Sequence, residues 1–168
     1  NGLFEEALHH FLAAEDFSGA VELVKEQRIN LMNTIRWPVL DRWISLFPTQ
    51  VVENTPELWI IKTWLQYQRG HWADLPGYLQ HLNAILDRVS DEDTGICLAG
   101  EMNVLRSLLS FTQSDAEAVI SQTRKALEMI PYDFWIPRVF ARLLLAIGLL
   151  MVGEANSGMH ALYDAFEE

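Results

Sequence analysis

Cysteine and positive charge are both scarce in this sequence. Its 168 residues include one cysteine, Cys97, which excludes a disulfide within the chain and is typical of a reducing compartment such as the cytoplasm. We expect Cys97 to fill a buried apolar position. Lys and Arg number 12 against 23 Asp and Glu, which gives a net charge of −11. Because basic residues supply most of the affinity for phosphate backbones, we expect this segment to bind no nucleic acid.

A hydrophobic run long enough to span a membrane is also absent. The most apolar stretch, residues 134–152, contains Pro137 and two arginines, and its uninterrupted part covers only residues 143–152. A spanning helix needs roughly 20 apolar residues. No targeting segment is recognisable either. The sequence therefore predicts no membrane partner for this segment.

Recognisable catalytic and cofactor motifs are missing as well. Neither the phosphate loop G-x-x-x-x-G-K-[ST] nor the dinucleotide pattern G-x-G-x-x-G occurs, so we expect no nucleotide cofactor here. The five histidines include no pair four residues apart, the spacing that helical zinc sites favour. The carboxylates at 91–93 lack the spacing of a calcium-binding EF-hand loop. These absences predict a segment that is not an enzyme and holds no metal.

Helical periodicity dominates what is present. Apolar residues recur at the i, i+3, i+4 spacing of amphipathic helices, and no β pattern is convincing. Ser18 is a candidate N-cap, Gly70 a candidate left-handed C-cap, and residues 90–95 a candidate acidic turn. The predicted helices cover residues 2–14, 18–29, 38–46, 57–69, 75–89, 96–112, 115–129, 134–152 and 156–168.

The predicted helices are arranged in pairs. Gly70, Ser114 and Gly153 occupy equivalent junctions, 44 and 39 residues apart, and residues 13–18 resemble an earlier junction of the same kind. Two helices in every 34 to 47 residues or so indicate an α-solenoid. We therefore predict an all-α fold, a right-handed superhelix of tetratricopeptide-like helix pairs.

The whole chain is predicted to form one helical-repeat domain over residues 1–168. Residues 1–48 supply the leading helices and residues 55–168 the tetratricopeptide-like pairs. The chain begins without a methionine and ends inside a predicted helix, so we expect it to be a piece of a longer protein.

One helix carries the first candidate binding residues. At 100° per residue, Trp59 projects into the polar stripe of helix 57–69, beside Lys62 and Gln66. An exposed tryptophan flanked by hydrogen-bonding groups can serve as a platform for a sugar or a peptide. The competing interpretation is that Trp59 packs under a neighbouring helix, and we regard this as the commoner situation.

Two arginines form the second candidate. Arg138 and Arg142 are four residues apart, so they share one face of an otherwise apolar helix. Together they could hold an anionic ligand or a peptide carboxylate. We favour the alternative, in which they pair with nearby acidic residues or face the solvent.

Three segments resemble a known family in their order and spacing. Residues 2–17 form the first, and residues 40–48 (LDRWISLFP) match the pattern L-x-R-W-[LI]-x-x-L-P except at Phe47, the residue before the proline. The third comprises residues 56–58, residues 63–64 and residues 70–75 (GHWADL). Over residues 1–90 the chain resembles the middle region of the large ATP-dependent, LuxR-type (maltose-regulator-like) transcriptional regulators of bacteria, which are STAND signal-transduction ATPases.

The resemblance implies a protein of several modules. These are an ATPase switch, this helical region as the effector sensor, and a C-terminal helix-turn-helix that binds DNA. It carries no catalytic residue or cofactor site into this segment. The leading hypothesis is a cytoplasmic sensor segment that binds a small-molecule inducer or a protein partner and contacts other domains of its own chain. The alternative is a stand-alone tetratricopeptide-like adaptor that only binds protein.

Overall fold

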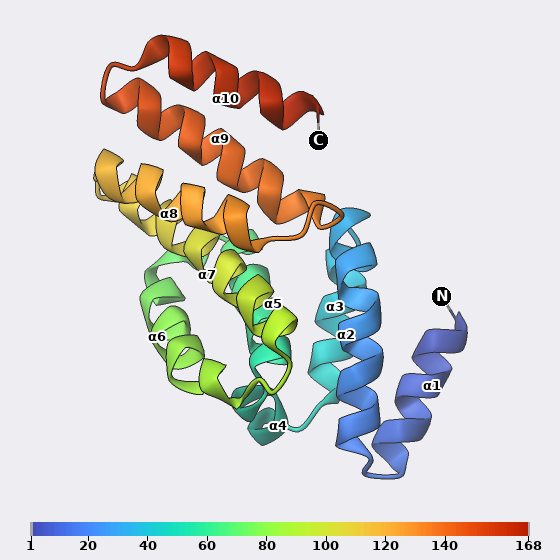
Figure 1. The fold of residues 1–168 in the computed structure, drawn as a ribbon. Helices are drawn as coiled ribbons and strands as arrows, with labels where there is room; N and C mark the ends of the chain where they lie inside the picture. Colours follow the sequence, from blue (N-terminus) through green and yellow to red (C-terminus); the bar gives the residue numbers. More distant parts are fainter. Residues whose placement is uncertain (1, 168) are drawn as a thin grey trace. The chain divides into compact units, whose positions relative to one another are not determined.

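The computed structural model of the chain describes the backbone of residues 2–167 and the side chains of residues 3–163. Within this range it contains α-helices and two short 3-10 helices but no β-strand, which confirms the predicted all-α class. The helices fall into two compact units (Figure 1). Unit 1 ends at Asp74 and unit 2 begins at Leu75.

Unit 1 is built around α5. Its helix α1 packs against α2 and α3, while α2, α3 and α4 all contact α5. Leu40, Trp43 and Trp64 are among its largest fully buried side chains. The elements of unit 1 are α1 (Gly2–Ala13), α2 (Phe17–Asn33), α3 (Trp37–Leu46), α4 (Thr49–Asn54), α5 (Pro56–Gln68) and the 3-10 helix η1 (Trp72–Asp74).

Unit 2 is a series of helices in which α7, α8, α9 and α10 each pack against the next. In Figure 1 these helices run antiparallel to their neighbours. Gly100 of α7 allows a close approach, since a Cβ there would lie 2.7 Å from the Cγ1 of Ile130. The elements are α6 (Leu75–Ile85), the 3-10 helix η2 (Leu86–Arg88), α7 (Glu92–Thr112), α8 (Ala116–Met129), α9 (Trp135–Met151) and α10 (Ala155–Glu167).

Five helix ends share one turn geometry. In each, a residue with positive φ follows the helix, and the next residue donates its backbone N–H to the carbonyl five positions earlier, at 2.8–3.0 Å. This is the Schellman motif, which satisfies carbonyls that the helix leaves unpaired. The positive-φ residues are Glu15, Ile35, Gly70, Ser114 and Gly153. The left-handed cap predicted at Gly70 is confirmed, and the three other predicted junctions have the same geometry.

The N-caps differ in part from the sequence prediction. The carboxylate of Asp16 accepts a hydrogen bond from the backbone N–H of Gly19 at 3.0 Å, so Asp16 is the N-cap of α2 and the prediction of Ser18 is wrong. Asp91 caps α7 in the same way, at 2.8 Å from Thr94. Residues 92–95 therefore belong to α7 rather than to an acidic turn.

The prediction also missed one helix and shortened another. The six residues of α4 directly follow Pro48, where Phe47 and Pro48 end α3, and so short a segment shows no periodicity. Helix α2 continues to Asn33 because Leu31 and Met32 extend its buried stripe.

The cap at Ile35 carries backbone strain that can be relieved. Ile35 has φ 57 and is 60% exposed, and a β-branched residue is disfavoured in the left-handed region. We predict that Ile35→Gly raises the free energy of unfolding by about 1 kcal/mol, measured by urea denaturation. Ile35→Ala is the control, because it keeps the Cβ and most of the strain. Equal effects of the two substitutions would contradict this explanation.

Candidate functional site

A cavity of about 240 Å³ lies between α3, α4 and α5, and we call it the α5 groove. Its apolar side chains, Ile44, Phe47, Val52 and Leu65, are all buried. Its polar side chains are half-buried or exposed, namely Asp41, Ser45, Thr49, Lys62, Gln66 and Arg69. The groove thus combines an apolar floor with a polar rim, which is the usual composition of a small-ligand site. Two residues predicted from the sequence, Lys62 and Gln66, line it.

The charges of the α5 groove do not cancel. The Nη2 atom of Arg69 lies 2.7 and 2.6 Å from the two carboxylate oxygens of Asp41, so these two residues form an ion pair. Among the residues whose side chains the structure describes, Lys62 forms no ion pair. The three ionic side chains that line the groove therefore leave one positive charge.

The Trp59 ring contacts the ammonium group of Lys62 and is not an exposed platform. The Nζ atom of Lys62 lies 4.8 Å from the centroid of the Trp59 ring, a cation–π contact. Only 8% of Trp59 is exposed. The burial agrees with the favoured interpretation, in which Trp59 packs in the core, and the candidate exposed platform is wrong. The helical wheel of α5 placed Trp59 beside polar residues, but it contains no information about what packs over that side of the helix.

Gln66 is held in place by the turn that follows α5. Its Oε1 accepts a hydrogen bond from Nδ1 of His71 at 2.6 Å. The turn itself is closed by the backbone N–H of His71, which donates to the Gln66 carbonyl at 3.0 Å. The Schellman turn at Gly70 thereby fixes one end of the rim.

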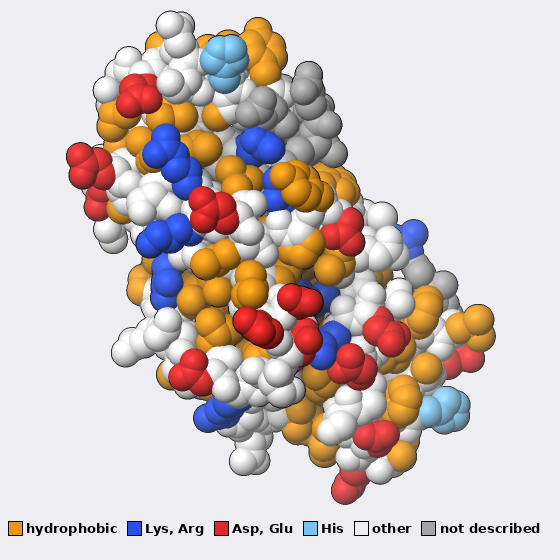
Figure 2. Space-filling model, in the orientation of Figure 1, with side chains coloured by type: hydrophobic (Ala, Val, Ile, Leu, Met, Phe, Trp, Pro, Cys, Tyr) orange, Lys and Arg blue, Asp and Glu red, His pale blue; other side chains and the backbone are white. Residues whose placement is uncertain are grey.

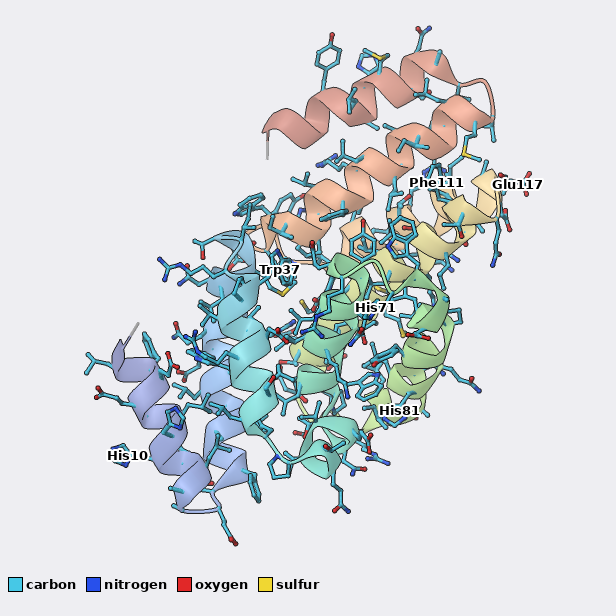
Figure 3. The ribbon with its side chains drawn as sticks, turned by 180° about the vertical axis from the view of Figure 1, so that it is seen from behind. His10, Trp37, His71, His81, Phe111 and Glu117 are labelled. Atoms are coloured by element: carbon cyan, nitrogen blue, oxygen red, sulfur yellow. The ribbon has the colours of Figure 1, made fainter. Side chains whose placement is uncertain are left out.

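The exposed aromatic side chain at this end of unit 1 is Trp72, which the sequence argument did not single out. Ring centroids are 6.4 Å apart between Trp37 and Trp64, 6.0 Å between Trp64 and Tyr67, and 5.5 Å between Tyr67 and Trp72. Burial raises the pKa of the Tyr67 phenol, whereas Trp72 is 43% exposed. Figure 3 shows Trp37 and His71 at this end. No signal in the sequence singled out Trp72, because it lies in the short 3-10 helix η1, where an α-helical wheel does not apply.

Arg138 of α9 is not available for the candidate anion site that it was to form with Arg142. Arg138 is 2% exposed, and its Nη1 donates to the carbonyls of Leu127 and Ile130 at 2.9 and 2.8 Å. Its guanidinium also lies 4.1 Å from the ring centroid of Tyr132. Arg138 thus caps the C-terminal end of α8, a role that neither sequence interpretation included, and burial keeps it from facing the solvent. Arg142 is half-buried.

Unit 2 contains a larger depression of about 650 Å³ beside α8. Its rim mixes Arg124 and Lys125 with Glu117, Glu128 and Glu154. Phe111 and Glu117, on either side of the α7–α8 turn, lie at one edge of unit 2 (Figure 3). On the face shown in Figure 2, basic side chains are interspersed with acidic ones. Because side chains of both charges surround this depression, it favours neither anionic nor cationic ligands.

The described residues form neither a membrane span nor a metal site. No helix among them is both long and apolar enough to cross a membrane. No group of three or more His, Cys, Asp or Glu side chains in the described part of the chain is placed to hold a metal ion. Cys97 is buried, as predicted.

The burial of Trp59 predicts a structural role. We expect Trp59→Ala to lower the free energy of unfolding by roughly 3 kcal/mol, because it removes a large buried ring and leaves a cavity. The matched control is Trp72→Ala, which we expect to cost about 1 kcal/mol because its ring is already half in solvent. Urea denaturation of both variants measures the difference. Equal losses would contradict the placement of Trp59 in the core.

Comparison with known proteins adds one relationship. No protein-family description and no solved structure matches the chain. The chain is similar to the HTH-type transcriptional regulator MalT of Cronobacter sakazakii, with 25% identity over 143 residues. The matched region covers 83% of this chain but 15% of MalT, so the chain spans a small part of that regulator's length. This similarity supports a relationship to LuxR-type regulators of the MalT kind.

Proposed function

We propose that this chain is the effector- or partner-binding helical segment of a bacterial, ATP-dependent LuxR-type transcriptional regulator. The observation that carries the proposal is the similarity to MalT, which extends over 83% of the chain and therefore includes both units. It agrees with the resemblance that residues 1–90 show to this family. In this proposal the segment is cytoplasmic and has no catalytic role of its own.

The repeated turns support a solenoid of helix pairs. Glu15, Gly70, Ser114 and Gly153 end helices with the same hydrogen bonds, and three of them recur 44 and 39 residues apart. Such repetition is the mark of tetratricopeptide-like arrays, which use their surfaces to bind ligands or proteins. We therefore extend the proposal to an α-solenoid.

The α5 groove is the proposed binding site. It offers a buried apolar floor, a rim of hydrogen-bonding groups and one uncompensated positive charge. A small-molecule inducer or a side chain of a protein partner would occupy it, and occupancy would bias the ATPase switch elsewhere in the whole protein. The segment itself would leave DNA binding to another module, because its net charge of −11 repels phosphate.

The proposal predicts a transcriptional phenotype that depends on the groove. The gene is deleted and complemented with full-length copies, and transcripts are measured by RNA sequencing. We expect the wild-type gene to restore at least one operon, and the double variant Lys62→Ala/Gln66→Ala to restore it about tenfold less well, as for hot-spot truncations. The control Arg124→Ala/Lys125→Ala removes two side chains from α8 and should restore expression fully.

Two results would contradict the proposal. If deletion changes no transcript and the full-length protein binds no ATP, the chain does not belong to such a regulator, and the stand-alone adaptor becomes the better explanation. If both double variants complement equally well at equal protein levels, the α5 groove is not the effector site.

A further inference from the structure

We propose that the α5 groove binds a small carboxylate monoanion with an apolar tail, whose carboxylate pairs with Lys62. This inference rests on the proposed function in so far as it names the chemical class of the effector. Four features of the groove support it. These are the net charge of its lining, the fixed position of the Lys62 ammonium group, the fixed side chain of Gln66 on the rim, and the size of the cavity.

The first feature is charge. Asp41 is already neutralised by Arg69 through contacts of 2.7 and 2.6 Å, so it neither attracts nor strongly repels an incoming anion. Lys62 has no carboxylate within ion-pair distance among the described side chains, although the chain carries 23 acidic residues. One positive charge in a half-buried position matches one negative charge on a ligand.

The second feature is the position of the Lys62 ammonium group. The Trp59 ring lies 4.8 Å from its Nζ and is itself 8% exposed, so the ring is a fixed support. A cation–π contact leaves the N–H donors that point away from the ring available. Lys62 is therefore oriented before a ligand binds, so its side chain loses less conformational entropy on binding.

The third feature is the rim beside Lys62. Gln66 is fixed through its Oε1 by His71 at 2.6 Å, which leaves its amide N–H donors for a ligand. Thr49 contributes a hydroxyl group on the α4 side of the groove. A carboxylate at Lys62 can thus receive a charged and a neutral hydrogen bond from α5.

The fourth feature is size. A volume of about 240 Å³ corresponds to roughly eight water molecules at their liquid volume, so it accommodates a ligand of about that number of non-hydrogen atoms. The floor of Ile44, Phe47, Val52 and Leu65 is apolar and buried, and it favours a branched hydrocarbon tail. Inorganic phosphate fits less well, because it carries more charge than Lys62 compensates and has no apolar part.

The experiment is a titration of the 168-residue chain with 3-methylbutanoate, followed by two-dimensional NMR of the ¹⁵N-labelled protein. We expect saturable shifts at Lys62, Gln66 and their neighbours. The neutral isostere 3-methylbutanamide should bind at least about tenfold more weakly, since it cannot form the ion pair. Inorganic phosphate at the same ionic strength should neither shift these signals nor compete.

Two variants make the assignment specific. Lys62→Gln should weaken 3-methylbutanoate binding about tenfold or more, while Lys125→Gln, which removes a positive charge from α8, should leave it unchanged. Absence of saturable shifts, equal binding of acid and amide, or unchanged binding by Lys62→Gln would each overturn the proposal. Equally strong binding of phosphate would show a nonspecific anion site and overturn it too. These failures leave the transcriptional phenotype untouched, so they are distinguishable from failure of the proposed function.

Discussion

Helix α5 is apolar over most of its circumference, and the arrangement of unit 1 depends on covering it. Leu58, Ile60, Ile61 and Trp64 are fully buried, and α2, α3 and α4 all pack against this helix. The side that carries Lys62 and Gln66 remains partly open. The same packing that buries α5 therefore creates the groove and determines which of its side chains reach solvent.

Periodicity in the sequence predicted the helices well because an amphipathic stripe is a local property. The turns were predicted where glycine or a repeated pattern marked them, as at Gly70, but Ile35 has no such signal in the sequence.

Of the candidate binding residues, only some lie where the sequence analysis placed them. Lys62 and Gln66 line the groove, whereas Trp59 is buried and Arg138 caps α8. Both candidate roles failed because of tertiary contacts, which the residues of a single helix do not specify.

Charge connects the structure to the proposed function. The chain as a whole is strongly acidic, so a groove with one uncompensated cation differs from its surroundings. Its position on α5 lies within the part of the sequence that resembles LuxR-type regulators. A ligand that joins the polar rim to the apolar floor would stabilise the packing of α3 and α4 on α5. Such binding can bias a switch if the ligand has a higher affinity for one of the two states of the protein.

Helix α5 is the stable core of unit 1, and the groove is built on it. Native-state amide hydrogen exchange of the 168-residue chain, read by mass spectrometry, measures the local stability of each helix. We expect peptides from α5 to exchange more slowly than any others in unit 1, and peptides from α1, which packs mainly against α2 and α3, to exchange fastest. Exchange in α5 as fast as in α1 would contradict it.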